Sequence, residues 1–363
     1  MSIALNRARR LPAMLVVAAG ALSFLAACSS GSSDTTPTPV PDVTQGAVIE
    51  PAKVAPPAPV VAPRWPLTGL GAPEVAVRPA LAIKIENSGD ARPQTGLDQA
   101  DNVWEEVVEG GISRFVAVFD SQVPAEVGPI RSVRPMDPAI VAPMHGLIAF
   151  SGGQPIFVNA LKAAGVQTIS QDAGAPGFYR KKGVGPAPHN VYGTPQKFWD
   201  QAAADRTSPP PAQFVFAKKA DSATAVAGGT PAGTVSVHLS GYAKPTWSWD
   251  PTSSTYLRSE GSTPAIVRSG ARITATNIIT LTVHLVNSGT VDPAGNPVPE
   301  TILQGTGDGT LSSGGKYVAV TWKKGSVGEV LTLTAADGTP ATLAPGATWI
   351  ELVPTGTGSV TMS

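Results

Sequence analysis

Two arginines in one short loop are the residues best suited to binding an anion. Arg131 and Arg134 lie in the segment Gly128-Pro129-Ile130-Arg131-Ser132-Val133-Arg134-Pro135, which has a proline near each end. Two guanidinium groups can hold a carboxylate or a phosphate through paired N–H donors. Residues three apart in an extended segment point to opposite sides, so both arginines reach one ligand only if the loop turns. The alternative is that they pair with acidic side chains of this chain.

His189 is the candidate for moving a proton, because an imidazole titrates near neutral pH. Pro188 and Asn190 flank it, and this composition predicts a loop. A lone histidine in a loop is more often structural than catalytic, so both roles stay open. We expect no metal site, because the four histidines lack spacings such as H-E-x-x-H.

Sequence motifs for nucleophilic catalysis and for nucleotide binding are missing from this chain. Ser132 does not lie in the G-x-S-x-G turn of a hydrolase. Ser151-Gly152-Gly153 is not followed by a G-x-x-x-x-G-K-[ST] loop. Cys28 is the only cysteine, which excludes an intramolecular disulfide and a cysteine metal site. We therefore expect no cofactor.

These polar residues follow strands of a predicted α/β layer. Apolar runs predict strands at residues 80–85, 115–119, 147–150 and 166–169, and residues 155–164 predict a helix. The loops that follow such strands gather at one edge of the sheet, which is the usual place for a ligand crevice.

Residues 95–109 predict a further helix, because their apolar residues recur at steps of three and four. Four acidic residues fall on the opposite face, which we expect to be solvated: Asp98, Asp101, Glu105 and Glu109. These carboxylates are the alternative partners of Arg131 and Arg134.

The chain changes character after residue 207. Residues 208–363 are rich in Ser, Thr and Gly, and runs such as Tyr317-Val318-Ala319-Val320-Thr321-Trp322 alternate as half-buried strands do. We predict an α+β protein. Residues 64–207 would form an α/β sandwich-like domain with a mixed sheet, and residues 208–363 a mostly β domain.

The first 27 residues resemble a bacterial export signal. Arg7, Arg9 and Arg10 precede an apolar stretch that ends in Leu25-Ala26-Ala27-Cys28. Cysteine at this point resembles a lipobox, in which the thiol is lipidated, for example with palmitate, and becomes the new N-terminus. The alternatives are an uncleaved membrane anchor and an ordinary cysteine. Residues 28–63 are rich in proline and predict a disordered tether, so we expect a protein held on the outer face of the cell membrane.

The charge balance argues against nucleic acid as a partner. The whole chain has 26 basic and 26 acidic residues, and loss of the three arginines of the signal would leave a net charge of −3. Nucleic-acid binding requires a basic surface. The expected partners are the membrane, through the lipid, and a cell-wall ligand or an envelope protein.

Several motifs follow one another in the order of a known family. They are Ala82-Ile83-Lys84-Ile85-Glu86-Asn87, Ala91-Arg92-Pro93-Gln94-Thr95-Gly96-Leu97, Ser113-Arg114-Phe115, the loop at residues 128–135 and Pro188-His189-Asn190. The chain resembles the YerB-like lipoproteins, which are built from two adjoining regions of unknown function. This resemblance implies an exported, membrane-anchored envelope protein and brings no catalytic residues. It supports treating the polar residues of these motifs as one site, namely Arg92, Gln94, Arg114, Arg131, Arg134, His189 and Asn190. We add Asn87 to this site.

Two functions are compatible with these residues. In the first, the protein is not an enzyme, and its arginines bind a cell-wall anion or a partner protein. In the second, it is an envelope hydrolase or transferase, with His189 as the acid/base and Arg131 and Arg134 holding a charged substrate. We favour the first function, because the sequence has no nucleophile motif.

Overall fold

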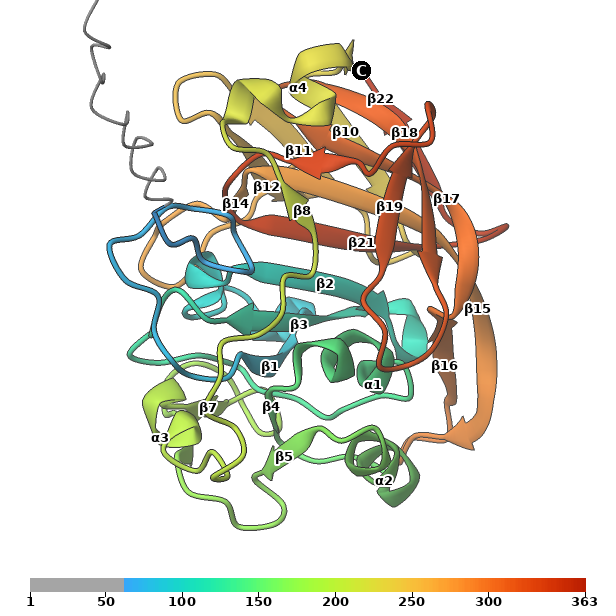
Figure 1. Ribbon diagram of the computed structural model, residues 1–363. Helices are drawn as coiled ribbons and strands as arrows, with labels where there is room; N and C mark the ends of the chain where they lie inside the picture. The colour runs from blue at the N-terminus through green and yellow to red at the C-terminus, as the bar shows by residue number, and fades with distance from the viewer. Residues whose placement is uncertain (1–61) are drawn as a thin grey trace, which may run out of the picture. The chain divides into compact units, whose positions relative to one another are not determined.

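A mixed sheet of twelve strands forms the centre of the fold (Figure 1). The computed structural model describes residues 62–363. The predicted signal at residues 1–27, the predicted lipidation site Cys28 and nearly all of the predicted tether at residues 28–63 lie outside the described residues.

The large sheet combines strands from both halves of the chain. Its order is β19-β18-β17-β15-β21-β2-β3-β1-β4-β5, with β16 beside β15 and β9 beside β18. β21 therefore lies between β2 and β15, so strands from both sides of residue 208 share one sheet. The strands are β1 Leu81–Glu86, β2 Asn102–Val107, β3 Ser113–Phe119, β4 Leu147–Phe150, β5 Gln167–Ser170, β9 Thr230–Pro231, β15 Asn277–Val291, β16 Pro297–Ile302, β17 Gly305–Ser313, β18 Lys316–Lys324, β19 Thr332–Ala335 and β21 Thr348–Pro354.

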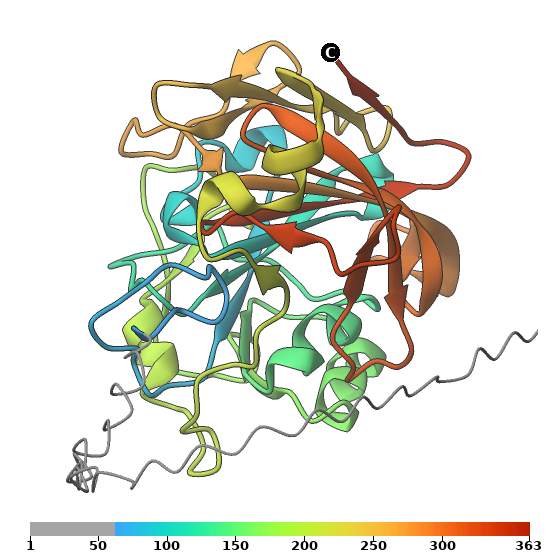
Figure 2. The same ribbon diagram turned by 45° about the horizontal axis from the view of Figure 1, so that its top comes forward.

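A smaller sheet of six strands packs on one face of the large sheet (Figure 2). Its order is β13-β12-β11-β10-β22, with β14 beside β12. The strands are β10 Thr234–His238, β11 Pro245–Asp250, β12 Thr255–Glu260, β13 Thr263–Pro264, β14 Thr274–Ala275 and β22 Ser359–Met362. Two short pairs complete the strands: β6 Phe178–Arg180 with β7 Val191–Gly193, and β8 Val215–Phe216 with β20 Thr342–Leu343.

The helices of the described residues are short. The α-helices are α1 Asp137–Val141, α2 Pro155–Ala163, α3 Pro195–Trp199 and α4 Thr224–Gly228. The 3-10 helices are η1 Gly89–Ala91, η2 Leu97–Gln99, η3 Glu109–Gly111, η4 Ala142–Met144 and η5 Ala220–Ser222. The fold is thus rich in strands. Its central sheet is mixed, as predicted, because β1 pairs antiparallel with β3 and parallel with β4.

The predicted helix at residues 95–109 is wrong. The segment forms η2 and then β2, and every residue of β2 is buried. Both faces of β2 are covered, because Trp104 packs in one core and Val103 in the other, so the alternation of a half-exposed strand is lost. Apolar residues on both faces also satisfy steps of three and four, which is why the helix pattern fitted. The expected solvated acidic face does not exist, because Glu105 and Glu109 are buried and only Asp98 is exposed.

Alternate side chains of the central strands build two separate cores. On one face, Trp104 and Val116 pack with residues of α1 and α2. On the other face, Val103 and Phe115 pack with the small sheet. Successive side chains of a strand point to opposite faces, so each central strand contributes to both cores.

A buried ion-pair group lies on the face that carries α1. Lys84 Nζ donates to Asp137 Oδ1 at 2.7 Å and also binds Glu106, and all three side chains are fully buried. Burial, followed by the charge of Asp137, raises the pKa of Glu106 to about 8. Asp137 Oδ2 also accepts from Arg134 N at 2.6 Å, so this group holds the end of the arginine loop against the sheet.

Asp120, directly after β3, is a buried carboxylic acid. Within residues 62–363, neither of its carboxylate oxygens has a hydrogen-bond partner. Burial, followed by the charge of Asp101, raises the pKa of Asp120 to about 7. Arg78 opposes this rise and donates through Nε to the backbone oxygen of Asp120 at 3.2 Å.

We expect Asp120→Asn to stabilise the fold more at pH 8 than at pH 5. The folded protein holds a proton on Asp120 up to about pH 7, whereas the unfolded chain releases it near pH 3.8. The wild-type fold therefore loses stability as the pH rises between these values, and the asparagine variant escapes this loss. The gain at pH 8 should exceed that at pH 5 by about 2.5 kcal/mol, measured by urea unfolding of the full chain.

Asp98→Asn is the matched control, because Asp98 is exposed and its substitution should have a small effect at both pH values. Equal stabilisation by Asp120→Asn at pH 5 and pH 8 would contradict the prediction.

Candidate functional site

Three neighbouring strands carry pairs of polar residues at one end of the large sheet. The pairs are Glu86-Asn87 at the end of β1, Glu105-Glu106 in β2 and Ser113-Arg114 at the start of β3. Arg114 lies opposite Glu86 in one neighbouring strand and opposite Glu106 in the other. Because successive side chains alternate, each pair sends one side chain to each face. Two polar clusters therefore form back to back.

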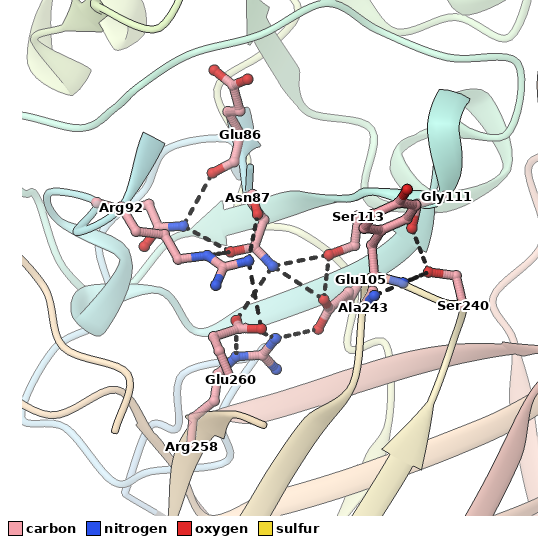
Figure 3. A network of polar contacts seen from close by, with 12 residues as sticks. Glu86, Asn87, Arg92, Glu105, Gly111, Ser113, Ser240, Ala243, Arg258 and Glu260 are labelled. Atoms are coloured by element: carbon pink, nitrogen blue, oxygen red, sulfur yellow. Dashed lines mark hydrogen bonds and ion pairs between the residues drawn. The ribbon is translucent and has the colours of Figure 1, made fainter. Parts of the chain in front are cut away.

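The first cluster centres on Glu86, whose side chain points away from Asn87 (Figure 3). His189 Nδ1 lies 2.8 Å from Glu86 Oε1, and Arg131 Nε lies 3.3 Å from Glu86 Oε2. Glu86 is buried, whereas the side chains of Arg131 and His189 are each 20% exposed. We call Glu86, Arg131 and His189 the Glu86 cluster. The structure thus brings the predicted Arg131 and His189 together through a carboxylate.

The loop that carries Arg131 continues as extended backbone beside β1. Glu86 N donates to Pro129 O at 3.0 Å, and Arg131 N donates to Lys84 O at 2.9 Å. This pairing sets the direction of the Arg131 side chain towards Glu86 and fixes the loop to the rigid part of the sheet.

Arg134 does not join Arg131, so the two arginines do not converge on one point. Arg134 NH2 donates to Glu109 Oε2 at 2.7 Å, and Arg134 NH1 donates to Val133 O at 2.8 Å. Arg134 therefore pairs with an acidic side chain of this chain, which was the alternative to binding an anion together with Arg131. Its partner Glu109 begins the 3-10 helix η3, which follows β2, and does not lie on the helix that was predicted at residues 95–109.

Arg114 lies between these two groups. Its NH2 lies 3.8 Å from Glu109 Oε2, and its NH1 donates to Ser132 O at 3.3 Å. Burial, followed by the charge of Arg134, lowers the pKa of Arg114 to about 10, so it stays charged at neutral pH. Three guanidinium groups thus face two carboxylates, those of Glu86 and Glu109.

The second cluster surrounds Asn87 on the face of the small sheet (Figure 3). Asn87 Nδ2 donates to Ser113 Oγ at 2.9 Å and to Glu260 Oε1 at 3.3 Å. Asn87 Oδ1 accepts from Arg92 Nε at 3.1 Å and from Gln94 Nε2 at 3.0 Å. We call Asn87, Arg92, Gln94 and Glu260 the Asn87 cluster. The predicted Asn87, Arg92 and Gln94 do meet, but away from the Glu86 cluster.

Arg258 connects the Asn87 cluster to the core between the sheets. This fully buried arginine lies 2.8 Å from Glu105, 2.9 Å from Glu260 and 3.1 Å from Glu351. Burial, followed by the charge of Glu105, raises the pKa of Glu351 well above its usual range. Burial alone would raise the pKa of Glu260, but the charges of Arg258 and Arg92 outweigh it and lower this pKa. Glu260 therefore stays ionised.

Asn190 holds the hairpin that carries His189. Asn190 Nδ2 donates to Gly185 O at 3.3 Å, and Arg180 NH1 donates to Asn190 Oδ1 at 2.8 Å. The contacts of Asn190 thus shape the connection between β6 and β7.

Sequence reasoning missed Glu86, Arg258 and Glu260 as site residues. Glu86 has a local signal, because it ends an apolar strand and precedes Asn87. Arg258 and Glu260 sit in β12. Arg258 contacts Glu105 in β2 and Glu351 in β21, and Glu260 contacts Asn87 after β1, all far away in the sequence. No local pattern indicates such partners.

Residues 62–363 contain no group of three or more His, Cys, Asp or Glu side chains that could hold a metal ion. In the part of the chain that the structure describes, no helix has the length and the apolar character needed to cross a membrane.

Comparisons with known proteins agree on one family. The model described as "Protein of unknown function (DUF3048) N-terminal domain" matches residues 67–208, and the model of the corresponding C-terminal domain matches residues 235–350. These adjoining domains define a class of two-part proteins whose function is not assigned. The chain belongs to this family, the YerB-like proteins.

One relative and one solved structure support this assignment. The chain is 36% identical over 129 residues to "Putative lipoprotein YerB" of Bacillus subtilis (strain 168), which covers 35% of this chain and 39% of the relative. The match thus spans about two fifths of that relative. The crystal structure of the YerB protein from Bacillus subtilis has a TM-score of 0.69 at 24% identity, covering 82% of this chain and 99% of that one. This likeness shows that the two proteins share a fold.

Proposed function

We propose that this protein is an exported lipoprotein on the outer face of the cell membrane that binds an anionic envelope ligand at the Glu86 cluster. The placement of Arg131 carries the proposal. Its Nε lies 3.3 Å from Glu86 Oε2 without a hydrogen bond, and none of the side-chain hydrogen bonds within residues 62–363 involves its two terminal nitrogens. The ligand is a cell-wall anion or an acidic group of a partner protein.

The geometry suits an anion because the donors are held in place before binding. Glu86 contacts both Arg131 and His189, so neither side chain needs to be ordered by the ligand. Ordering costs are a large part of what weakens binding, and a pre-organised guanidinium avoids them. His189 Nε2 likewise has no partner among the described residues, and it adds a donor when both ring nitrogens carry a proton.

The surrounding charge also favours an anion. Arg114, Arg131 and Arg134 outnumber the carboxylates of Glu86 and Glu109. The hairpin that carries His189 adds two exposed cations, Arg180 and Lys182.

The export and lipid anchor rest on the sequence pattern that ends at Cys28 and on a relative that is named a lipoprotein. We expect Cys28→Ser to move the full chain from the membrane fraction into the soluble fraction of its host. Mass spectrometry of the wild-type N-terminal peptide should find a lipidated Cys28 and no residues before it. A wild-type chain that is soluble and keeps Met1 through Ala27 would contradict this part of the proposal.

We expect Arg131→Ala to weaken anion binding by roughly 10- to 100-fold, because charge-assisted hydrogen bonds contribute about 1.5–3 kcal/mol. The measurement is calorimetric titration of the full chain with inorganic phosphate and with purified peptidoglycan fragments. Lys219→Ala is the matched control, because it removes an exposed positive charge that lies outside the Glu86 cluster and its hairpin. Unchanged binding by Arg131→Ala would reject the site.

A second function is favoured by one specific contact. Glu86 Oε1 lies 2.8 Å from His189 Nδ1, so a carboxylate can orient the imidazole and leave Nε2 to accept or give a proton. In this alternative, the protein is an envelope hydrolase or transferase, and Arg131 holds the charged substrate.

If the alternative holds, His189→Ala should lower turnover of peptidoglycan or a phosphodiester by roughly 10²- to 10⁴-fold, the usual contribution of general acid–base catalysis. Glu86→Gln should lower turnover by a smaller factor, since it removes only the orienting charge. Turnover by the wild-type chain that survives His189→Ala would exclude this mechanism.

A further inference from the structure

A pocket of about 230 Å³ lies on the other face of the sheet end, beside the Asn87 cluster. One wall is the loop that follows β1, which contributes Asn87, Arg92 and Gln94, and the other is the segment between β12 and β14. Arg268 ties the two walls together, because its backbone N donates to Gln94 O at 2.7 Å. The pocket is therefore built into the fold before any ligand arrives.

Most of the lining is apolar. Phe115 and Ile273 are buried and form the inner wall, while Ile266 is 41% exposed and forms the outer wall. Ligand pockets are commonly apolar with a few placed polar groups that orient the ligand. Drug-sized ligands occupy roughly 300–1,000 Å³, so this pocket fits a smaller molecule.

The polar end of the pocket presents one cation and one anion. Arg92 uses Nε and NH2 on Asn87, and within residues 62–363 its NH1 has no hydrogen-bond partner. Glu260 Oε1 accepts from Arg258 and Asn87, whereas among the described residues its Oε2 accepts no hydrogen bond. Arg92 NH2 and Glu260 Oε2 are 3.7 Å apart, so the guanidinium that carries the free NH1 lies beside the free acceptor.

The two groups keep opposite charges. Asn87 O accepts a hydrogen bond from Arg92 NH2. Burial alone would raise the pKa of Glu260, but the charge of Arg258 lowers it, so Glu260 is ionised at neutral pH. An isolated anion would be attracted by Arg92 and repelled by Glu260. An isolated cation would be attracted by Glu260 and repelled by Arg92. A ligand that carries both charges close together satisfies both groups.

We propose that this pocket binds a small zwitterion, an α-amino acid with an apolar side chain, either free or as part of a short peptide. The α-carboxylate binds Arg92, the α-ammonium binds Glu260 Oε2, and the side chain packs between Phe115, Ile266 and Ile273. This site is separate from the Glu86 cluster and does not depend on the proposed anion binding.

The test is calorimetric titration of the full chain with four probes. Leucine carries both charges, N-acetylleucine lacks the ammonium, leucinamide lacks the carboxylate, and alanyl-leucine separates the charges further. Leucine or the dipeptide should bind, and each probe that lacks one charge should bind at least tenfold more weakly than leucine. Tighter binding of leucine assigns the site to free amino acids, and tighter binding of the dipeptide assigns it to peptides. Failure of both to bind at millimolar concentration would overturn the proposal.

Two variants assign each charge to its partner. Arg92→Ala should remove the preference for leucine over leucinamide and keep the preference over N-acetylleucine. Glu260→Gln should do the opposite, and it retains an acceptor for Arg258. Preferences that stay unchanged in both variants would show that these residues do not hold the ligand.

Ile266→Trp keeps the test decisive if Glu260→Gln fails to fold. A large ring at this half-exposed position should fill the pocket and abolish leucine binding, while circular dichroism stays that of the wild type. Val77→Trp is the matched control, because Val77 is 75% exposed and does not line the pocket. Full leucine binding by a folded Ile266→Trp variant would overturn the proposal.

Discussion

The rest of the structure depends on the burial of Arg258 between the two sheets. Its guanidinium lies 4.7–5.4 Å from the rings of Phe115, Trp247 and Trp349 and binds carboxyl groups of both sheets. A buried charge is very costly unless its partners are complete, so the two sheets can pack only in the register that supplies them. The same contacts keep Glu260 ionised and place it beside Asn87. The position of the pocket follows from this packing.

The alternation of strand side chains explains why two distinct polar sites share one end of the sheet. Glu86 and Asn87 are neighbours in the chain but serve opposite faces, and so do Ser113 and Arg114. One face gathers an excess of guanidinium groups around Glu86, and the other pairs one cation with one anion over an apolar wall. The first arrangement suits an anion and the second suits a zwitterion.

Local patterns predicted much of the fold. The apolar runs that became β1, β3, β4 and β5, and the helix α2, were visible because short-range patterning decides them. β2 was mistaken for a helix because β21, its partner on one side, lies more than 200 residues away. For the candidate site, Arg131 and His189 were predicted, whereas Arg258 and Glu260 were not. The reason is that Arg258 meets Glu105 and Glu351, and Glu260 meets Asn87, from other parts of the chain.

The sequence by itself determined which residue types could do chemistry, the strand-rich second half and the signal-like start. It also determined the family, because the motifs that carry the resemblance are contiguous. Only the tertiary structure decided that Arg131 meets His189 through Glu86, that Arg134 turns to Glu109, and that Asn87 and Arg92 face a separate pocket. The physical reason is that patterning acts over a few residues, whereas a buried charge is satisfied by whichever partner the packing of distant strands brings near.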